Sequence, residues 1–448
     1  MKSPRPIGPN LARATFRIVL YVVVVLSPVL IVTALRPQSA MGFAYTLGLH
    51  AGLVGITILA LQVVLSARLF WIERPFGLDQ LLRFHKAMAI FGSLLVLAHP
   101  VLLAWGSGRW TLLSSWNQPW YIWLGRAALL VLIVTVVVSW FRRRIKFEFQ
   151  SWRLSHNVLA VSLLLLAFLH SIVAGRDLEH PVMRIVWPLG GVVIASVYGF
   201  HKWIRPLWLR RNRYRVTELI RENDDVTTVK LTPVSERQRF DYLPGQFHFI
   251  TFHADHADVP TEEHHWTISS SPTEDGFLTS TIKASGDFTA KIPKLKVGDT
   301  AEVQGPYGRF SYLLHPRENS IVMIAGGIGI TPIMAMLRHM RDTGSPNHVL
   351  LIYANRTQSD IVFRKELDEI SRCDHPKLTL VHVLSHPDES WNGPKGFVDG
   401  ELIAKHCHAP TDNAFYVCGP PPMTDAVTSA LLDMGVLQSQ IHGERFSL

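Results

Sequence analysis

The chain has 448 residues, 48% of them hydrophobic, and a formal net charge of +9. Its mean hydropathy of +0.19 is too high for an ordinary soluble enzyme, and the apolar residues are concentrated in residues 1–205. The composition therefore excludes a purely soluble protein and predicts a membrane domain followed by a soluble part.

The membrane domain is expected to contain six transmembrane helices, because six apolar runs lack Lys, Arg, Asp and Glu. The first run alone could pass for the apolar part of a signal peptide, but five more follow it, so it is predicted to be the first helix. The runs are Ile18–Leu35, Met41–Ala67, Ala87–Gly108, Ala127–Phe141 (extended backward by Tyr121–Gly125), Leu154–Gly175 and Ile185–Phe200.

The basic residues predict the orientation of these helices. Nineteen Lys and Arg residues fall in the N-terminal tail, the second and fourth loops and the segment after the sixth run, against five on the other side. This asymmetry places both termini in the cytoplasm, and we expect a bacterial inner or plasma membrane. The positive charge is thus explained by topology and anionic lipid, and we expect no nucleic-acid partner.

Four histidines predict bound haem. His85 and His99, and likewise His156 and His170, are separated by 14 residues within two of the expected helices. Fourteen residues advance a helix by ~21 Å and return it to within ~40° of the same face. With both helices running outward, His85 meets His156 in the inner leaflet and His99 meets His170 in the outer one. Imidazoles are costly in lipid, and these pairs suit the axial ligands of two stacked b-type haems.

Several neighbouring residues have two possible roles. Midway between the histidines, Gly92 and Leu163 are expected on the haem-facing side, where a glycine permits close approach of a macrocycle or of another helix. His50 either lies near the outer haem or is a packing histidine. Arginines expected near the haems either pair with propionates or anchor the helices at the membrane surface; they are Arg83 and Arg153 on the inner side and Arg36 and Arg126 on the outer side.

The soluble part is expected to begin with an antiparallel β-barrel, residues 206–316, and to continue with a parallel α/β domain, residues 317–448. Short strands with turn signals indicate the barrel, and alternating strands and helices indicate the α/β domain. The barrel strands are Tyr214–Leu231, Pro244–Phe252 and a strand–turn–strand unit at His265–Thr281; the α/β elements are strand Ile321–Ile324, helix Ile333–Met340, strand Val349–Tyr353, helix Ile361–Ile370 and strand Leu378–Val383.

Two motifs in the α/β domain predict dinucleotide binding. The turn Ala325–Pro332, which contains Gly326, Gly327 and Gly329, follows a strand and opens a helix, so it can bring backbone close to a pyrophosphate. Near the end of the chain, Cys418-Gly419-Pro420 follows another strand, where a small turn can admit a nicotinamide. The three cysteines, Cys373, Cys407 and Cys418, show no C-x-x-C spacing, which argues against an iron–sulfur cluster or a disulfide framework.

These motifs, with residues 353–356 (Tyr-Ala-Asn-Arg) and 363–367 (Phe-Arg-Lys-Glu-Leu), resemble the nucleotide-binding half of the ferredoxin–NADP reductase superfamily, cytochrome b5 reductase included. Residues 264–270 (His-His-Trp-Thr-Ile-Ser-Ser) resemble its flavin strand, and residues 286–289 (Gly-Asp-Phe-Thr) its phosphate loop. His264 stands where the soluble reductases carry Arg, so the resemblance implies that compensation of the pyrophosphate charge is either weaker or comes from Lys283 and the backbone. The terminal segment resembles the family's flavin-stacking aromatic at Phe446, with two residues following it.

The resemblance implies the following site residues. Phe446 and Cys418 would act at the site of hydride transfer. FAD would be held by His264, Trp266, Thr267, Thr281, Ile282, Lys283, Gly286, Asp287, Phe288, Thr289 and Thr331, and NAD(P)H by Gly326, Gly327, Gly329, Thr331, Pro332, Arg356, Ser385, Cys418, Gly419 and Pro420. Arg356 and Lys395 are candidates for a 2′-phosphate contact, which favours NADPH and leaves NADH open.

Joined to a six-helix domain with two histidine pairs, the chain resembles the ferric reductase and NADPH oxidase family over nearly its whole length. The resemblance implies electron flow from cytoplasmic NAD(P)H through FAD and two haems to an external acceptor, either a ferric chelate or oxygen, with superoxide formed from oxygen. Oxidases of the family usually carry a second His one turn beyond the outer ligand, where this chain has Leu103, so ferric reduction is favoured. Arg36 and His50 are polar candidates near that acceptor.

Two alternatives stay open at this point. The haems could instead reduce a quinone or a periplasmic redox protein. A transporter with a regulatory flavin domain is the non-enzymatic alternative, although the membrane domain has almost no acidic residues to form a proton or cation path. The sequence leaves protein partners and oligomeric state undefined.

Overall fold

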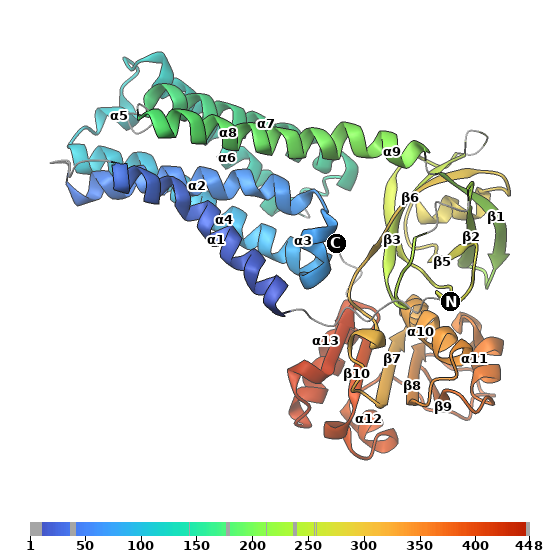
Figure 1. Ribbon diagram of the computed structural model, residues 1–448. Helices are drawn as coiled ribbons and strands as arrows, with labels where there is room; N and C mark the ends of the chain where they lie inside the picture. The colour runs from blue at the N-terminus through green and yellow to red at the C-terminus, as the bar shows by residue number, and fades with distance from the viewer. Residues whose placement is uncertain are drawn as a thin grey trace. The chain divides into compact units, whose positions relative to one another are not determined.

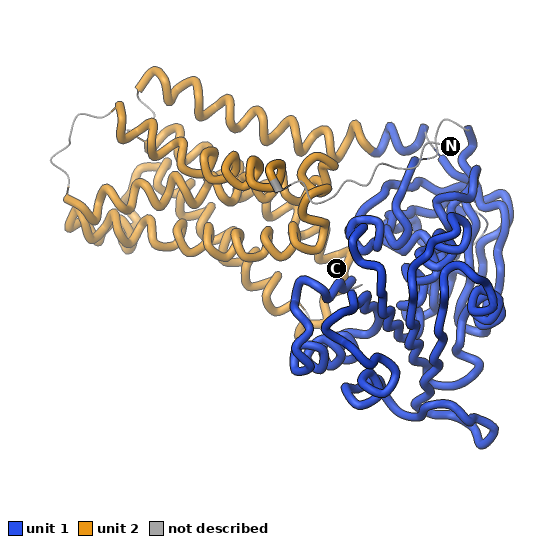
Figure 2. The backbone as a smooth tube through the Cα atoms, turned by 60° about the horizontal axis from the view of Figure 1, so that its bottom comes forward, with its two compact units in different colours: residues 1–9, 206–448 blue, residues 10–205 orange. Residues whose placement is uncertain are grey.

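A computed structural model describes residues 11–35, 42–142, 144–175, 180–211, 213–235, 240–254, 256 and 258–444. The chain divides into two compact units, one formed by Asn10–Arg205 and the other containing Pro206–Leu448 (Figure 2). The exact domain limits expected from the sequence, 1–205, 206–316 and 317–448, stay a prediction.

The first unit is a bundle of long apolar helices (Figure 1), and the prediction of six membrane-spanning helices is confirmed by their length and composition. The last span continues from α8 through a π-helical turn, Phe200–Ile204, into α9, Arg205–Arg211. Two short helices, α3 (Phe70–Phe76) and α5 (Thr111–Ser114), were not expected. The spanning helices are α1 (Leu11–Leu35), α2 (Phe43–Ser66), α4 (Leu78–Ser107), α6 (Trp120–Phe141), α7 (Phe149–Ala174) and α8 (Pro181–Gly199).

Helices α4 and α7 begin before the apolar runs from which they were predicted. Helix α4 begins at Leu78 rather than Ala87, and α7 begins at Phe149 rather than Leu154. The apolar runs mark only the part suited to hydrocarbon, whereas the helices continue through Arg83, Lys86 and Arg153, whose long side chains can reach polar surroundings from within a helix.

Small residues bring α2 and α4 into close contact. A methyl group on Gly55 would lie 2.8 Å from Cγ2 of Val96, and one on Gly92 would lie 3.0 Å from Cγ2 of Ile58. Gly92 is therefore a helix-packing residue on the α2 side of α4, which is one of its two expected roles; the close approach of a haem stays a prediction. Leu163 is buried in a cluster with Leu59 and side chains of α6.

The second unit begins with a six-stranded antiparallel sheet in the order β4-β3-β6-β1-β2-β5. The edge strands approach each other, because the N–H of Ser269, just after β4, donates to the carbonyl of Thr279 in β5 at 2.8 Å. The sheet therefore curls into the expected barrel. The strands are β1 (Arg213–Arg221), β2 (Val226–Pro233), β3 (Phe247–His253), β4 (Glu263–Thr267), β5 (Leu278–Lys283) and β6 (Thr300–Tyr307).

The expectation of one strand over Tyr214–Leu231 is wrong, since this segment forms the hairpin β1–β2. The turn is stabilised by its polar residues: the side-chain oxygen of Asn223 accepts from the N–H of Asp225 at 3.0 Å. The side chains of Val216, Val229 and Leu231 alternate into the barrel core on both sides of this turn. Strand β6 was not expected.

The remaining residues form a five-stranded parallel sheet in the order β11-β10-β7-β8-β9, which confirms the expected α/β fold. Helices α10 and α11 pack on one face, and α12 and α13 on the other. The chain runs outward from β7 to β9 and then returns to β10 on the other side of β7, so β7 and β10 flank the point where the strand order reverses. The elements are β7 (Ser320–Gly326), α10 (Ile330–Asp342), β8 (His348–Asn355), α11 (Arg364–Ile370), β9 (Lys377–Leu384), α12 (Gly400–His406), β10 (Ala414–Cys418), α13 (Pro421–Asp433) and β11 (Ile441–Glu444).

Candidate functional site

The four histidines lie on two helices and meet in two pairs. Helix α4 carries His85 and His99, and α7 carries His156 and His170. The imidazoles of His85 and His156 are close enough to interact electrostatically, and those of His99 and His170 interact in the same way. The structure thus brings His85 together with His156 and His99 together with His170, as the spacing of 14 residues and the common direction of the two helices predict.

The second pair is oriented by backbone carbonyls of neighbouring helices. Nδ1 of His99 lies 2.8 Å from the carbonyl oxygen of Gly48 in α2, and Nδ1 of His170 lies 2.7 Å from that of Tyr121 in α6. A carbonyl only accepts, so in each neutral imidazole Nδ1 carries the proton and Nε2 keeps its lone pair. This is the arrangement found in histidines that ligate a metal through Nε2.

Two glycines make room for these imidazoles. A methyl group on Gly52 would lie 2.6 Å from Nδ1 of His99, and one on Gly125 would lie 2.8 Å from Cε1 of His170. Each glycine lies four residues after the residue whose carbonyl accepts the hydrogen bond from the imidazole. Because Cβ atoms in a helix tilt toward its N-terminus, the residue at this position covers the carbonyl one turn earlier. Gly52 and Gly125 were missed in the sequence because each could be read as an ordinary helix-packing residue.

The first pair has different surroundings. Oγ of Ser139 in α6 lies 3.3 Å from Nδ1 of His156, and the ring of Trp152 lies 5.3 Å from the His156 ring. A hydroxyl can accept from Nδ1 as a carbonyl does, so it can also leave Nε2 available. Ser139 and Trp152 were not expected at this site.

The arginines near the pairs are differently engaged. Arg126 donates to the carbonyl of Leu112 at 2.8 Å and lies 4.7 Å above the Trp123 ring, so it anchors the start of α6. Arg83 is exposed and Arg153 is half-buried. Arg36 lies outside the described residues.

The expected flavin strand and phosphate loop meet through their aromatic side chains. The ring of Phe288 stacks on His264 at 3.9 Å and on Trp266 at 6.0 Å. His264 also pairs with the carboxylate of Glu262 at 3.1 Å. An acidic group therefore stands beside the residue that replaces the usual arginine.

Hydroxyl groups near the flavin strand are largely engaged with one another. Thr281 shares hydrogen bonds with Thr228 at 2.8 Å and Ser269 at 3.0 Å. The side chain of Ile282 is buried in the barrel core. The hydroxyl of Thr281 is thus engaged with two neighbours, whereas the buried hydroxyl of Thr267 has no hydrogen-bond partner in the described part of the chain.

The phosphate loop closes on itself through Thr289. Its hydroxyl accepts from the N–H groups of Ser285 at 2.9 Å and Gly286 at 3.0 Å. Two backbone donors at the start of the loop are therefore used within the chain. Of the remaining loop members, Asp287 is exposed, and Lys283 ends the neighbouring strand β5.

The glycine-rich turn and the Cys-Gly-Pro turn are in contact. Strands β7 and β10 pair so that Ala325 lies beside Cys418. A methyl group on Gly329 would overlap the backbone of Cys418 and Gly419, and one on Gly326 would lie 2.9 Å from Cδ of Pro420. Both turns lie at the carboxyl ends of their strands, where the strand order reverses. This is the general ligand-binding position of open α/β sheets.

Helix α10 begins directly after this turn at Ile330, three residues before its expected start. Thr331 and Pro332 are buried in its first turn, where Thr331 donates to the carbonyl of Ile328 at 3.1 Å. The phenol of Tyr353 donates to the carbonyl of Gly327 at 3.2 Å and so supports the glycine turn from β8. Gly327 has a φ of +53°, which favours glycine.

The two candidates for contact with the 2′-phosphate, Arg356 and Lys395, lie at the ends of β8 and β9 together with the expected NAD(P)H residue Ser385. The N–H of His386 donates to the carbonyl of Arg356 at 2.7 Å, which places Ser385 next to Arg356. The backbone of Lys395 forms an isolated parallel β-bridge with that of Leu384, the last residue of β9. Arg356 is exposed.

Cys418 does not present an exposed thiol. Its side chain is fully buried in the core cluster on the α10 face of the sheet. Burial raises the pKa of the Cys418 thiol well above its usual value, so the thiol stays protonated. Phe446, the other expected catalytic residue, lies outside the described residues.

An unexpected arginine links the barrel to the parallel α/β domain within the second unit. From α10, Arg338 donates to the carbonyl of Ser269, at the end of the flavin strand, at 2.6 Å. The same guanidinium makes two bonds to Glu366 in α11, at 2.8 Å and 2.6 Å. Such a bidentate, charge-assisted contact fixes geometry strongly. In the sequence, Arg338 looks like any exposed helix residue.

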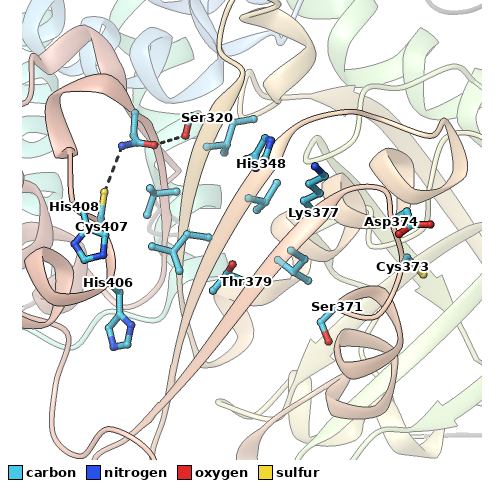
Figure 3. Close-up of a pocket in the computed structure, with 16 residues that line it drawn as sticks. Ser320, His348, Ser371, Cys373, Asp374, Lys377, Thr379, His406, Cys407 and His408 are labelled. Carbon is cyan, nitrogen blue, oxygen red and sulfur yellow. Dashed lines mark hydrogen bonds between the residues drawn. The ribbon is translucent and has the colours of Figure 1, made fainter.

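A cavity of about 460 Å³ lies at the other end of the parallel sheet, where its strands begin (Figure 3). It is lined by Ser320, His348 and Lys377, the first residues of β7, β8 and β9, and by the segment 406–408. Asn413 bonds to Ser320 and Cys407 at its border. Because it lies at the amino ends of the strands, this cavity is separate from the turns described above.

Three family descriptions match successive parts of the chain. Residues 51–167 match the ferric reductase-like transmembrane component, residues 213–312 match the oxidoreductase FAD-binding domain, and residues 323–429 match the oxidoreductase NAD-binding domain. The first match covers both histidine pairs except His170.

The soluble unit is similar to curated reductases. The chain is 34% identical over 180 residues to NADH-cytochrome b5 reductase 1 of Dictyostelium discoideum, covering 39% of this chain and 62% of that protein. It is 33% identical over 196 residues to NADH-cytochrome b5 reductase 2 of Mus musculus, covering 38% of this chain and 71% of that protein. The chain thus spans only about three fifths of the Dictyostelium relative.

Among solved structures, similarity extends to the ferredoxin reductase in carbazole 1,9a-dioxygenase, with 29% identity and a TM-score of 0.45 over 52% of this chain and 69% of that one. The cytochrome b5 reductase domain of Ulva prolifera nitrate reductase gives 22% identity and a TM-score of 0.45 over 52% and 97%.

The three matched regions follow one another in the order of the membrane bundle, the barrel and the parallel sheet. The chain is therefore an integral membrane protein that combines a ferric reductase-like transmembrane component with an oxidoreductase FAD-binding domain and an oxidoreductase NAD-binding domain.

Proposed function

We propose that the membrane domain holds two b-type haems and that the protein reduces an acceptor on the external side, preferentially a ferric chelate. When bound, FAD and the haems supply hydride acceptance and one-electron transfer, which link NAD(P)H to this acceptor. The observation that carries the proposal is the pairing of the four imidazoles, with Nδ1 of His99 and His170 bonded to carbonyls. Nε2 of each is then available to iron.

The chain's own residues have distinct tasks in this proposal. The turn at Gly326–Gly329 allows a pyrophosphate to approach the start of α10, and the Cys418–Pro420 turn beside it borders the place for the nicotinamide. Trp266 and Phe288 offer an aromatic surface to FAD, and Thr267 a hydroxyl. Cys418 contributes through its backbone, because its thiol is buried and protonated.

The acceptor side is proposed from residues near the His99–His170 pair. Two histidines bound to one iron leave no open coordination position, so reduction there would be outer-sphere. Leu103 lies beside Gly48, since a methyl group on Gly48 would lie 3.0 Å from the Leu103 N atom. No second imidazole follows His99 by one turn to assist oxygen. This favours a ferric chelate, with oxygen as a slower acceptor that yields superoxide.

The test compares single histidine variants of the purified full chain. We expect His99→Ala and His170→Ala each to lose one haem and to keep the other reducible by NADPH, because each iron depends on its own pair. The double variant should match either single variant. Haem content and reduced-minus-oxidised spectra measure this, and two haems in either single variant would contradict the pairing.

Donor and acceptor are tested separately. We expect NADPH to support faster flavin reduction than NADH, and Arg356→Ala to remove the difference, because a guanidinium pairs well with a phosphate. Equal rates with both donors in the wild type would remove the basis for this assignment. On the acceptor side, fast superoxide formation that is insensitive to a ferric chelate would favour an oxidase.

A further inference from the structure

Three ligand-type side chains converge beside β11, an edge strand of the parallel sheet. One nitrogen of His315, one of His442 and a carboxylate oxygen of Glu318 all lie within 4.8 Å of one another. Nε2 of His442 lies 2.8 Å from Oε1 of Glu318, and Nδ1 of His315 lies 3.8 Å from the same oxygen. No function described above uses these residues.

Local structure holds the three side chains in place. The N–H of Glu318 donates to the carbonyl of His315 at 3.1 Å, so both residues belong to one turn just before β7. His442 lies on β11, in register with Tyr416 of β10. The rings of His315 and His442 lie 4.0 Å apart. The cluster therefore joins the last strand of the sheet to the segment that leads into its first strand.

A buried phenol orients the carboxylate. The hydroxyl of Tyr416 donates to Oε2 of Glu318 at 2.6 Å, which leaves Oε1 directed toward both imidazoles. Hydrogen bonds from outside a metal's coordination sphere commonly fix its ligands in this way. The side chains of His315, Glu318 and His442 are 31%, 21% and 14% exposed, so an ion could enter and keep bound water.

We propose that His315, Glu318 and His442 bind one divalent transition-metal ion of the zinc or ferrous type. Two imidazoles and one carboxylate suit such ions better than Mg²⁺ or Ca²⁺, which prefer oxygen ligands. At metal–ligand distances of ~2.0–2.1 Å, tetrahedral ligands are ~3.3 Å apart. The present separations of 2.8 Å and 3.8 Å bracket this value.

The ion would replace the hydrogen bond between His442 and Glu318 and would cross-link β11 to the turn at residues 315–318. Arg309 is close enough to interact electrostatically with His315, and its positive charge opposes a bound cation. We therefore expect micromolar affinity and stabilisation of the soluble unit by the ion.

Equilibrium dialysis of the purified full chain against buffered, low-micromolar free Zn²⁺ tests the site. The chain has 21 histidines, so the comparison between variants matters more than the total metal bound. Glu318→Gln and His315→Gln remove ligands while keeping similar side-chain sizes, and His348→Gln, at an exposed histidine at the start of β8, is the matched control. FAD content reports that each variant has folded.

We expect the wild type and His348→Gln to bind one more zinc per chain than either ligand variant. Zinc should also raise the unfolding temperature in the wild type and in His348→Gln, but not in Glu318→Gln. Equal zinc in all four proteins would overturn the proposal and leave the cluster as a hydrogen-bonded link without an ion.

Discussion

Nδ1 of His170 lies 2.7 Å from the carbonyl oxygen of Tyr121, and Gly125 stands one helical turn after that carbonyl. His99 has the same relation to the Gly48 carbonyl and Gly52. One arrangement therefore occurs twice, on α2 and on α6, around the two histidines of one pair. In both cases the glycine is needed because the imidazole occupies the space of its missing methyl group.

The first prediction tests these two glycines. We expect Gly52→Ala and Gly125→Ala to lower the haem content at the His99–His170 pair at least several-fold, because a methyl group would lie 2.6 Å or 2.8 Å from the imidazole. Alanine favours helices by ~1 kcal/mol over glycine, so weakened helix propensity cannot explain a loss. Haem spectra of the purified variants provide the measurement.

Gly190→Ala is the matched control for that experiment, since a methyl group there would have no heavy atom within 4 Å. It should keep full haem content. A full haem complement in Gly52→Ala and Gly125→Ala would show that the imidazoles move without cost and that the glycines are ordinary packing residues.

A second prediction concerns the contact between the glycine-rich turn and Cys418. We expect Gly329→Ala to reduce the rate of flavin reduction by NAD(P)H at least tenfold, because its methyl group would overlap the Cys418 backbone and push the two turns apart. Gly443→Ala, on β11, is the control: its methyl group would meet only the carbonyl of Val417 at 3.7 Å. Stopped-flow flavin absorbance measures the rate, and similar rates in both variants would argue against the contact.

Thiol reactivity gives a third prediction. Cys373 is exposed, whereas Cys407 and Cys418 are buried and burial raises the pKa of both thiols. Because the thiolate is the reactive form, we expect a maleimide to label only Cys373 in the native protein. Mass spectrometry identifies the labelled peptide, and Cys373→Ser should remove the label. Rapid labelling of Cys418 would show that its strand opens.

The sequence predicts those features of the site that are determined within one segment, and it does not predict those that depend on contacts between distant segments. The spacing of His85 and His99 follows from helix geometry alone, and the turn at Gly326–Gly329 follows from backbone conformation, so both could be read from one segment. Gly52 and Gly125 have partners on other elements 45 residues or more away in the sequence, and Arg338 has partners 28 and 69 residues away. Nothing near each of them in the sequence distinguishes its role from packing or surface charge.

The same reasoning explains the errors in the fold. Residues 214–231 alternate between apolar and polar side chains on both sides of a short turn, which predicts one long strand. The Asn223–Asp225 hydrogen bond belongs to the turn that separates β1 from β2. The helix expected from Ile361 begins only at Arg364, because Phe363 has a φ of +59° and lies outside helical geometry. Periodicity alone leaves Gly92 open to a haem or to another helix, and its contact with Ile58 depends on how α2 packs.

The last prediction concerns acid sensitivity of the barrel. His248 on β3 is fully buried, and its Nε2 lies 2.6 Å from the hydroxyl of Ser280. Burial lowers the pKa of His248 to about 3, against ~6.5 in an unfolded chain. Between these values the unfolded chain binds the proton and the folded chain does not, so the free energy of unfolding falls as the pH decreases from about 6.5.

We expect this single group to destabilise the barrel by ~1.4 kcal/mol for each pH unit well below 6.5. His248→Gln removes the titrating group, so its loss of stability between pH 6 and pH 5 should be smaller than that of the wild type by about this amount. Urea unfolding of the full chain, followed by flavin fluorescence, measures the difference, and His348→Gln should behave like the wild type. Parallel pH profiles for His248→Gln and the wild type would mean that His248 becomes protonated within the folded barrel, which its burial opposes.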